Sequence, residues 1–147
     1  MYLHRIIIWI ISKILNQNPI QELYAIKKRV MQYMQKEKAS PTYQLQKYYP
    51  AIYNNIKQRQ FSYMQQCVVK NLNRGLEQDL YRQNIEVQFV ARIYFNGITG
   101  IKEESLFPHT MYEGETLYEM YLEYHLRGIV TPKGRNILNQ MIQSNQD

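Results

Sequence analysis

The chain contains 147 residues, 45% of them hydrophobic, which is enough to bury one core of moderate size but too little for two independent cores. Its one cysteine, Cys67, cannot form a disulfide within the chain, which excludes a disulfide-stapled scaffold and favours a reducing, cytoplasmic compartment. Five prolines and six glycines are few for an all-β protein, which needs frequent turns. We therefore expect one all-α domain over residues 1–147.

The net charge of +6 could attract nucleic acid or another anionic surface. However, the charges stand singly or in short runs, such as Lys27, Lys28 and Arg29. A run of this length is typical of the solvated face of a helix. We therefore expect these three side chains to face solvent.

The most apolar stretch, Ile6 to Ile11, raises the question of a membrane anchor or signal peptide. A membrane-spanning helix needs about 20 apolar residues, and Ser12 and Lys13 interrupt this stretch early. No cleavage site with small residues follows it. The sequence therefore predicts neither membrane insertion nor secretion.

Three helix starts are marked by a capping residue followed by proline: Asn18-Pro19, Ser40-Pro41 and Thr131-Pro132. Proline is well suited to the first helical position, where its missing N–H would have no helical partner, and the preceding side chain accepts from free backbone donors. Asn84 marks a fourth start, because Glu86 then falls in the first turn and favours the helix dipole.

Apolar residues three or four apart predict a helix from Pro19 to Lys38 and a longer helix from Pro50 to Leu76. A short helix is expected between them, from Pro41 to Tyr49, because Pro50 cannot donate the hydrogen bond that would continue it.

The next two predicted helices, Ile85 to Ile101 and Thr116 to Ile129, are apolar nearly all round. A helix of that kind needs cover on several sides, and a small domain offers little of it. We therefore expect a homodimer in which a second subunit covers part of both helices. The candidate interface residues are Val90, Tyr94, Ile98, Leu117, Tyr121, Leu122 and Tyr124.

Residues that could perform catalysis or bind a metal are scattered. His4, His109 and His125 have no spacing typical of a metal site, and His109 with Glu113 falls in a loop. Glycine-rich phosphate loops, Walker motifs and nucleophile elbows are missing. The sequence therefore predicts no enzyme activity, no catalytic residue, no metal and no cofactor.

Fourteen tyrosines, set at helical spacing beside several methionines, are the unusual feature of the composition. Tyrosines interleaved with basic residues can stack on single-stranded bases. Tyrosines and methionines on inward faces instead line a core or an amphipathic pocket. We favour the second interpretation, because Tyr24, Tyr63 and Tyr94 fall beside the apolar stripes.

Four short motifs occur in an order and spacing that resemble one protein family. They are Tyr43 to Pro50 (YQLQKYYP), Arg74 to Leu76 with Leu80 to Ile85, Leu106 to Pro108, and Tyr124 to Ile129 followed by Thr131 and Gly134. The series, over about Asn18 to Leu138, resembles the effector-binding half of tetracycline-repressor (TetR) family regulators, in a subgroup of Bacteroidetes type.

That resemblance implies an antiparallel helical bundle whose last long helices pair with those of a second subunit. It also implies a ligand cavity enclosed by the preceding helices, for a small hydrophobic or amphipathic effector; the alternative is a filled core. The candidate lining residues are Tyr24, Met31, Tyr63, Met64 and Tyr94.

The chain departs from the family pattern at two places. Asp79 stands where the subgroup usually has glycine, in a left-handed conformation that aspartate adopts at a cost of about 1 kcal/mol. The family's DNA-binding helix-turn-helix has no counterpart here, and residues 1–16 would be a remnant of the linker helix. DNA contact would then need the missing segment.

These features predict a ligand-sensing and dimerisation domain of a TetR-like transcriptional regulator. One alternative is a headless homologue that pairs with full-length regulators and antagonises them. A helical RNA-binding module is a further alternative, which rests on positive charge and tyrosine content.

Overall fold

The computed structural model describes the backbone of residues 17–36 and 41–144, and the side chains of residues 17–28 and 44–144. Within these ranges the chain forms helices and no strand, apart from an isolated antiparallel bridge between Tyr81 and Val130. The expectation of an all-α fold is thereby confirmed. The helices are α2 (Pro19–Lys36), α3 (Pro41–Tyr48), α4 (Pro50–Glu77), α5 (Val87–Gly100), α6 (Gly114–Arg127) and α7 (Pro132–Ser144).

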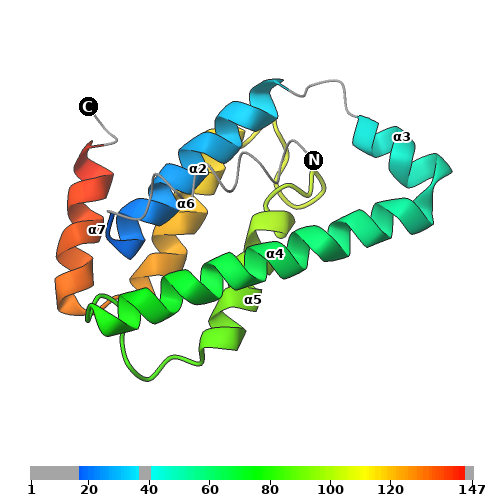
Figure 1. The fold of residues 1–147 in the computed structure, drawn as a ribbon. Helices are drawn as coiled ribbons and strands as arrows, with labels where there is room; N and C mark the ends of the chain where they lie inside the picture. The colour runs from blue at the N-terminus through cyan, green and yellow to red at the C-terminus, as the bar shows by residue number, and fades with distance from the viewer. Residues whose placement is uncertain (1–16, 37–40, 145–147) are drawn as a thin grey trace.

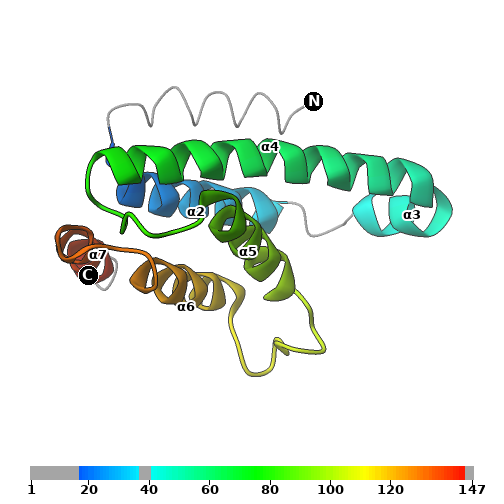
Figure 2. The same cartoon turned by 90° about the horizontal axis from the view of Figure 1, so that it is seen from below.

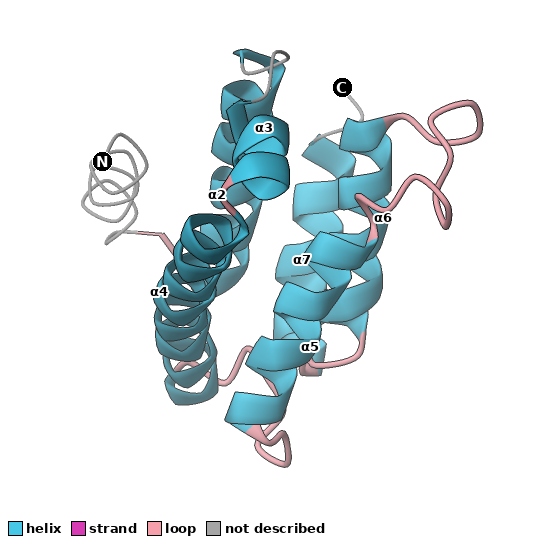
Figure 3. Ribbon diagram, turned by 90° about the vertical axis from the view of Figure 1, so that its right-hand side faces the viewer, coloured by secondary structure: helices cyan, strands magenta, loops and turns pink. Residues whose placement is uncertain are grey.

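The helices form two layers, with α2, α3 and α4 in one layer and α5, α6 and α7 in the other (Figure 3). The long helix α4 runs the length of the molecule, and its first half extends together with α3 away from α5, α6 and α7 (Figure 1). Helix α5 crosses between α4 and α6, and contacts both (Figure 2).

Two of the predicted capping sites are confirmed. The Asn18 side chain accepts a hydrogen bond from the Gln21 N–H at 2.9 Å, and the Thr131 hydroxyl accepts from the Gly134 N–H at 3.1 Å. The predicted cap at Ser40 lies outside the described residues. Proline at the first position of α4 also starts that helix where the sequence predicts, immediately after α3 and Tyr49.

The predicted start of α5 at Asn84 is wrong by two residues. Glu86 is the N-cap, because its carboxylate accepts from the N–H groups of Gln88 at 3.1 Å and Phe89 at 2.6 Å. A carboxylate at this position satisfies free backbone donors and also favours the helix dipole. Helix α6 likewise begins two residues before the predicted Thr116, at Gly114.

The core lies between the layers and contains a chain of buried polar groups. The Tyr81 hydroxyl donates to Asn71 Oδ1 at 2.8 Å, and Asn71 Nδ2 donates to the Pro19 carbonyl at 2.9 Å. A Cβ added at Gly75 would lie 2.0 Å from the Tyr81 ring, so only glycine leaves room for it. These hydrogen bonds therefore join the end of α4 to the α4–α5 loop and to the start of α2.

The α4–α5 loop is also held to the α6–α7 turn. Asp79 has a φ of 57°, which is the left-handed conformation expected at a position where the resembling family usually has glycine. After Asp79 the backbone turns toward the start of α7. The Thr131 N–H donates to the Leu80 carbonyl at 2.9 Å, and the Arg82 N–H donates to the Ile129 carbonyl at 2.8 Å. These bonds fix both layers to each other at one end.

Replacement of Tyr81 by phenylalanine tests the buried polar chain. It keeps the ring and leaves Asn71 Oδ1 buried without its donor, so we expect the free energy of unfolding to fall by about 1 to 3 kcal/mol. Urea denaturation measures the change. Tyr112→Phe, at a half-buried tyrosine of the α5–α6 connection, is the control and should lose much less. Equal losses in both variants would contradict the proposed role of the Asn71 bond.

Candidate functional site

The candidate dimer residues on α5 and α6 are mostly covered by the chain itself. Five of them are buried in the core, Tyr121 is half-buried, and Tyr124 is 81% exposed. The surface of these helices that a second subunit could reach therefore includes Tyr124 but is otherwise formed mostly by residues outside the candidate set. The five buried ones are Val90, Tyr94, Ile98, Leu117 and Leu122.

Four exposed apolar side chains occupy the outer side of the same two helices. Phe89 and Ile93 are one turn apart on α5, and Met120 and Tyr124 are one turn apart on α6. Tyr121 lies between the two pairs, since its hydroxyl donates to the Ile93 carbonyl at 3.0 Å. We name these four residues the α5–α6 face.

Helices α5 and α6 are held together by an aromatic cluster beneath that face. The ring centroids of Tyr94 and His125 are 4.8 Å apart, and those of Tyr94 and Tyr121 are 6.0 Å apart. A Cβ added at Gly97 would lie 2.0 Å from the Tyr121 ring, so the helices approach closely there. The Tyr94 and Tyr118 hydroxyls lie 3.4 Å from each other inside the core.

Burial controls the ionisation of this cluster. It lowers the pKa of His125 to about 4, because the imidazolium would lose its hydration among aromatic rings. It also raises the pKa of Tyr121 to about 12 and that of Tyr94 well above its usual value. The cluster is therefore neutral near pH 7, and it offers no base with a pKa near neutrality.

The candidate ligand-lining residues do not come together around one cavity. Tyr24 and Tyr94 are buried in the core, and Met64 is packed against it. The side chain of Met31 lies outside the described residues. Tyr63, in contrast, lines a depression on the outer side of α4, so the structure separates it from the other described candidates.

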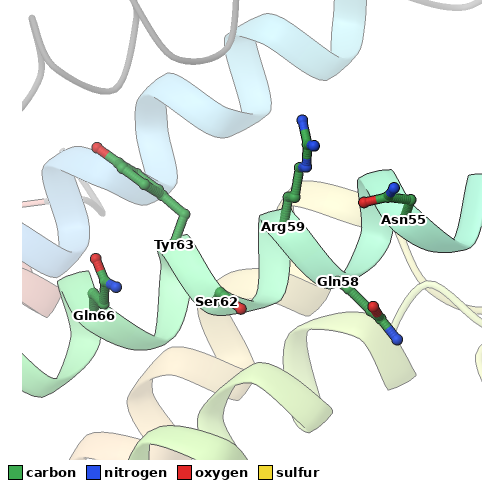
Figure 4. A pocket seen from close by; sticks show the side chains of 6 residues that line it. All are labelled: Asn55, Gln58, Arg59, Ser62, Tyr63 and Gln66. Carbon is green, nitrogen blue, oxygen red and sulfur yellow. The ribbon is translucent and has the colours of Figure 1, made fainter.

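The depression has a volume of about 400 Å³, is open to solvent, and is formed by α4 alone. Arg59 and Tyr63 point away from α5, whereas Gln58 points toward the opposite side of α4 (Figure 4). The Tyr63 hydroxyl interacts with Cys67 one turn further on. The lining residues are Asn55, Gln58, Arg59, Ser62, Tyr63 and Gln66.

Lys27 is not solvated, which corrects the interpretation of its charge run. Its side chain is buried, and its ammonium group donates to Glu119 Oε1 at 2.6 Å. Lys28 is exposed as predicted, while the side chain of Arg29 lies outside the described residues. Glu119 comes from α6, 92 residues away, so helical periodicity in α2 held no signal for this pair.

Groups of three or more potential metal ligands do not occur among the residues that the structure describes. His109 is exposed and pairs with Glu104, not with Glu113, and His4 lies outside the described ranges. In the same part of the chain, every helix is too short or too polar to cross a membrane.

No protein-family model, curated protein or solved structure matches this chain significantly. Function is therefore inferred from the surfaces of the molecule and from the TetR-like motifs.

The half-buried imidazole of His125 predicts a dependence of stability on pH. The unfolded chain takes up the proton near pH 6.5 and the folded chain only near pH 4, so the free energy of unfolding should fall as the pH falls through this window. Between pH 6.5 and 5 we expect a loss of about 2 kcal/mol, measured by urea denaturation.

Two variants isolate this effect. His125→Phe keeps an aromatic ring without the titrating group, and should lose less stability between the two pH values than the wild type. His109→Gln changes an exposed histidine and should keep the wild-type loss. The same loss in His125→Phe as in the wild type would contradict the assignment.

Proposed function

We propose that this chain is the ligand-sensing and dimerisation domain of a TetR-like transcriptional regulator. The observation that carries the proposal is the α5–α6 face, an exposed apolar surface on the pair of helices through which the resemblance implies dimerisation. The all-α fold and the order of the helices are compatible with it.

A twofold dimer would place this face against its own copy, so that eight apolar side chains are removed from water. Each buried side chain of this size contributes about 1.5 to 3 kcal/mol. Tyr121 lies between the two helices, with its hydroxyl on the Ile93 carbonyl. A face of four apolar side chains suits a dimer interface, whose centre is depleted of charged residues.

The effector part of the proposal rests on the depression beside Tyr63. It is a shallow, open depression of about 400 Å³ on α4, so a ligand there would keep one side in solvent. The Arg59 guanidinium and three amide side chains favour an anionic or strongly hydrogen-bonding group on the ligand, and the Tyr63 ring favours a flat apolar part. The expected effector is therefore amphipathic rather than purely apolar.

Helix α4, which carries the depression, also contacts α5 through residues outside the depression. The rings of Phe61 on α4 and Phe95 on α5 are 4.8 Å apart, and Gln65 Nε2 donates to the Gln88 side chain at 3.2 Å. A ligand that binds one position of α4 better than another would therefore bias the position of α5. Such differential binding is what a ligand needs in order to shift the dimer between two arrangements.

The test of the dimer uses exposed residues of the α5–α6 face, because a charge at a buried candidate residue, as in Leu122→Glu, would disrupt the core. Ile93→Glu and Tyr124→Glu place charges in the α5–α6 face, and each should raise the dimer dissociation constant at least tenfold while the fold is kept. Sedimentation equilibrium at micromolar concentration measures it. Gln140→Glu, on exposed α7, is the control and should dimerise like the wild type. A monomeric wild type would overturn the proposed interface.

The effector prediction compares two tyrosines in a thermal-shift screen of amphipathic small molecules. Tyr63→Phe should weaken the binding of any hit at least tenfold, because Tyr63 is one of the residues that line the depression. Tyr94→Phe should lower stability by about 1 to 3 kcal/mol and leave ligand affinity unchanged, because the Tyr118 hydroxyl loses its buried partner. A screen without hits, or a hit indifferent to Tyr63→Phe, would refute the site.

A further inference from the structure

One long stretch of the chain contains no acidic residue. Between Glu37 and Glu77 the sequence holds lysines and arginines but neither aspartate nor glutamate. This stretch includes α3 and most of α4. We name its projecting part, α3 with α4 as far as Gln60, the α3–α4 arm.

The arm is exposed nearly everywhere that its side chains are described. From Gln46 to Gln60 every side chain is exposed except that of Tyr53, which is half-buried. Tyr48 and Tyr49, at the elbow between the two helices, are 64% and 60% exposed. The arm also extends away from the layer of α5, α6 and α7 (Figure 1). It therefore contributes little to the core and is open to a partner.

The positive charges of the arm are not neutralised. Lys47, Lys57 and Arg59 have no carboxylate within ion-pair distance among the described residues. Two of them instead lie near tyrosine rings, with Lys47 Nζ 5.3 Å from the Tyr48 ring centre and Lys57 Nζ 5.2 Å from that of Tyr53. Lys47 and Lys57 therefore each stand beside an aromatic ring, whereas Arg59, two residues after Lys57, points to another side of α4 and lines the depression. A cation paired with an exposed ring suits an anionic partner that also carries flat rings.

The remaining exposed side chains of the arm include Ile52 and Ile56 but are mostly amides, and the amides favour one of two anionic partners. A lipid surface would have to desolvate the exposed amides of the arm, which is unfavourable. Nucleic acid, in contrast, accepts and donates hydrogen bonds to asparagine and glutamine at its phosphates and bases. The exposed amides are Gln44, Gln46, Asn54, Asn55, Gln58 and Gln60.

We propose that the α3–α4 arm binds single-stranded nucleic acid. Lys47 and Lys57 contact phosphates, and unstacked bases pack on the Tyr48 and Tyr49 rings. In a duplex the bases are stacked on one another, so these rings would have no base to receive. The site is separate from the α5–α6 face, and a dimer through that face would carry two arms.

The test measures fluorescence anisotropy of labelled 20-nucleotide single-stranded DNA and RNA of mixed sequence with the full chain. Two phosphate contacts predict that the logarithm of the binding constant falls with the logarithm of salt concentration with a slope of about −1.4. Lys47→Gln or Lys57→Gln should reduce the magnitude of this slope by about 0.7 each. Tyr48→Ala with Tyr49→Ala should weaken binding at least fivefold and leave the slope unchanged.

Arg135→Gln removes an exposed cation from α7 and is the matched control, which should bind like the wild type. Circular dichroism confirms that each variant keeps its helix content. Four results would overturn the proposal: no binding at 50 µM protein and about 50 mM salt, equal weakening by Arg135→Gln, duplex binding as tight as single-strand binding, or binding to vesicles with anionic lipid but not to nucleic acid.

Discussion

The hydrogen-bond chain from Tyr81 through Asn71 to the Pro19 carbonyl is the constraint on which the arrangement of the helices depends. All three groups are buried, so none of them can exchange its partner for water, and loss of one leaves another unpaired. The asparagine amide can serve both neighbours because it has an acceptor and a donor side. Gly75 is needed for the same arrangement, because the Tyr81 ring occupies the space that a side chain at position 75 would fill. The second half of α4 is thereby fixed in one position relative to α2 and to the α4–α5 loop.

The two halves of α4 consequently serve different purposes. Its second half contributes Val68, Asn71 and Leu72 to the interior, whereas its first half has almost no covered side chain. A helix that is exposed on most sides gains little from packing, and its composition is then free to suit a partner. The depression at Arg59 and Tyr63 lies where these halves meet. A ligand or a polyanion bound there would act on a helix whose other end is anchored in the core.

The sequence predicts a dimer interface on α5 and α6, and the structure buries five of its seven candidate residues while Tyr124 is exposed. Helical periodicity shows which residues share a face, such as Val90 with Tyr94 or Phe89 with Ile93. It does not show which of two apolar faces turns inward. That choice depends on Tyr121, which fills the space left by Gly97 and so fixes the rotation of both helices. The pocket candidates were separated for the same reason, because Tyr24 and Tyr94 turn into the core and Tyr63 turns away from it.

The sequence predicts helix caps, helix breaks and backbone conformation wherever the interacting groups are neighbours in the chain. The caps at Asn18 and Thr131 and the break at Pro50 involve groups within three or four residues, so spacing alone predicts them. The left-handed backbone at Asp79 has the same local character. The tertiary structure decided the rest. Lys27 looks solvated in its own helix, yet it is buried against Glu119, because a charge is stable inside only where a distant element supplies the opposite charge.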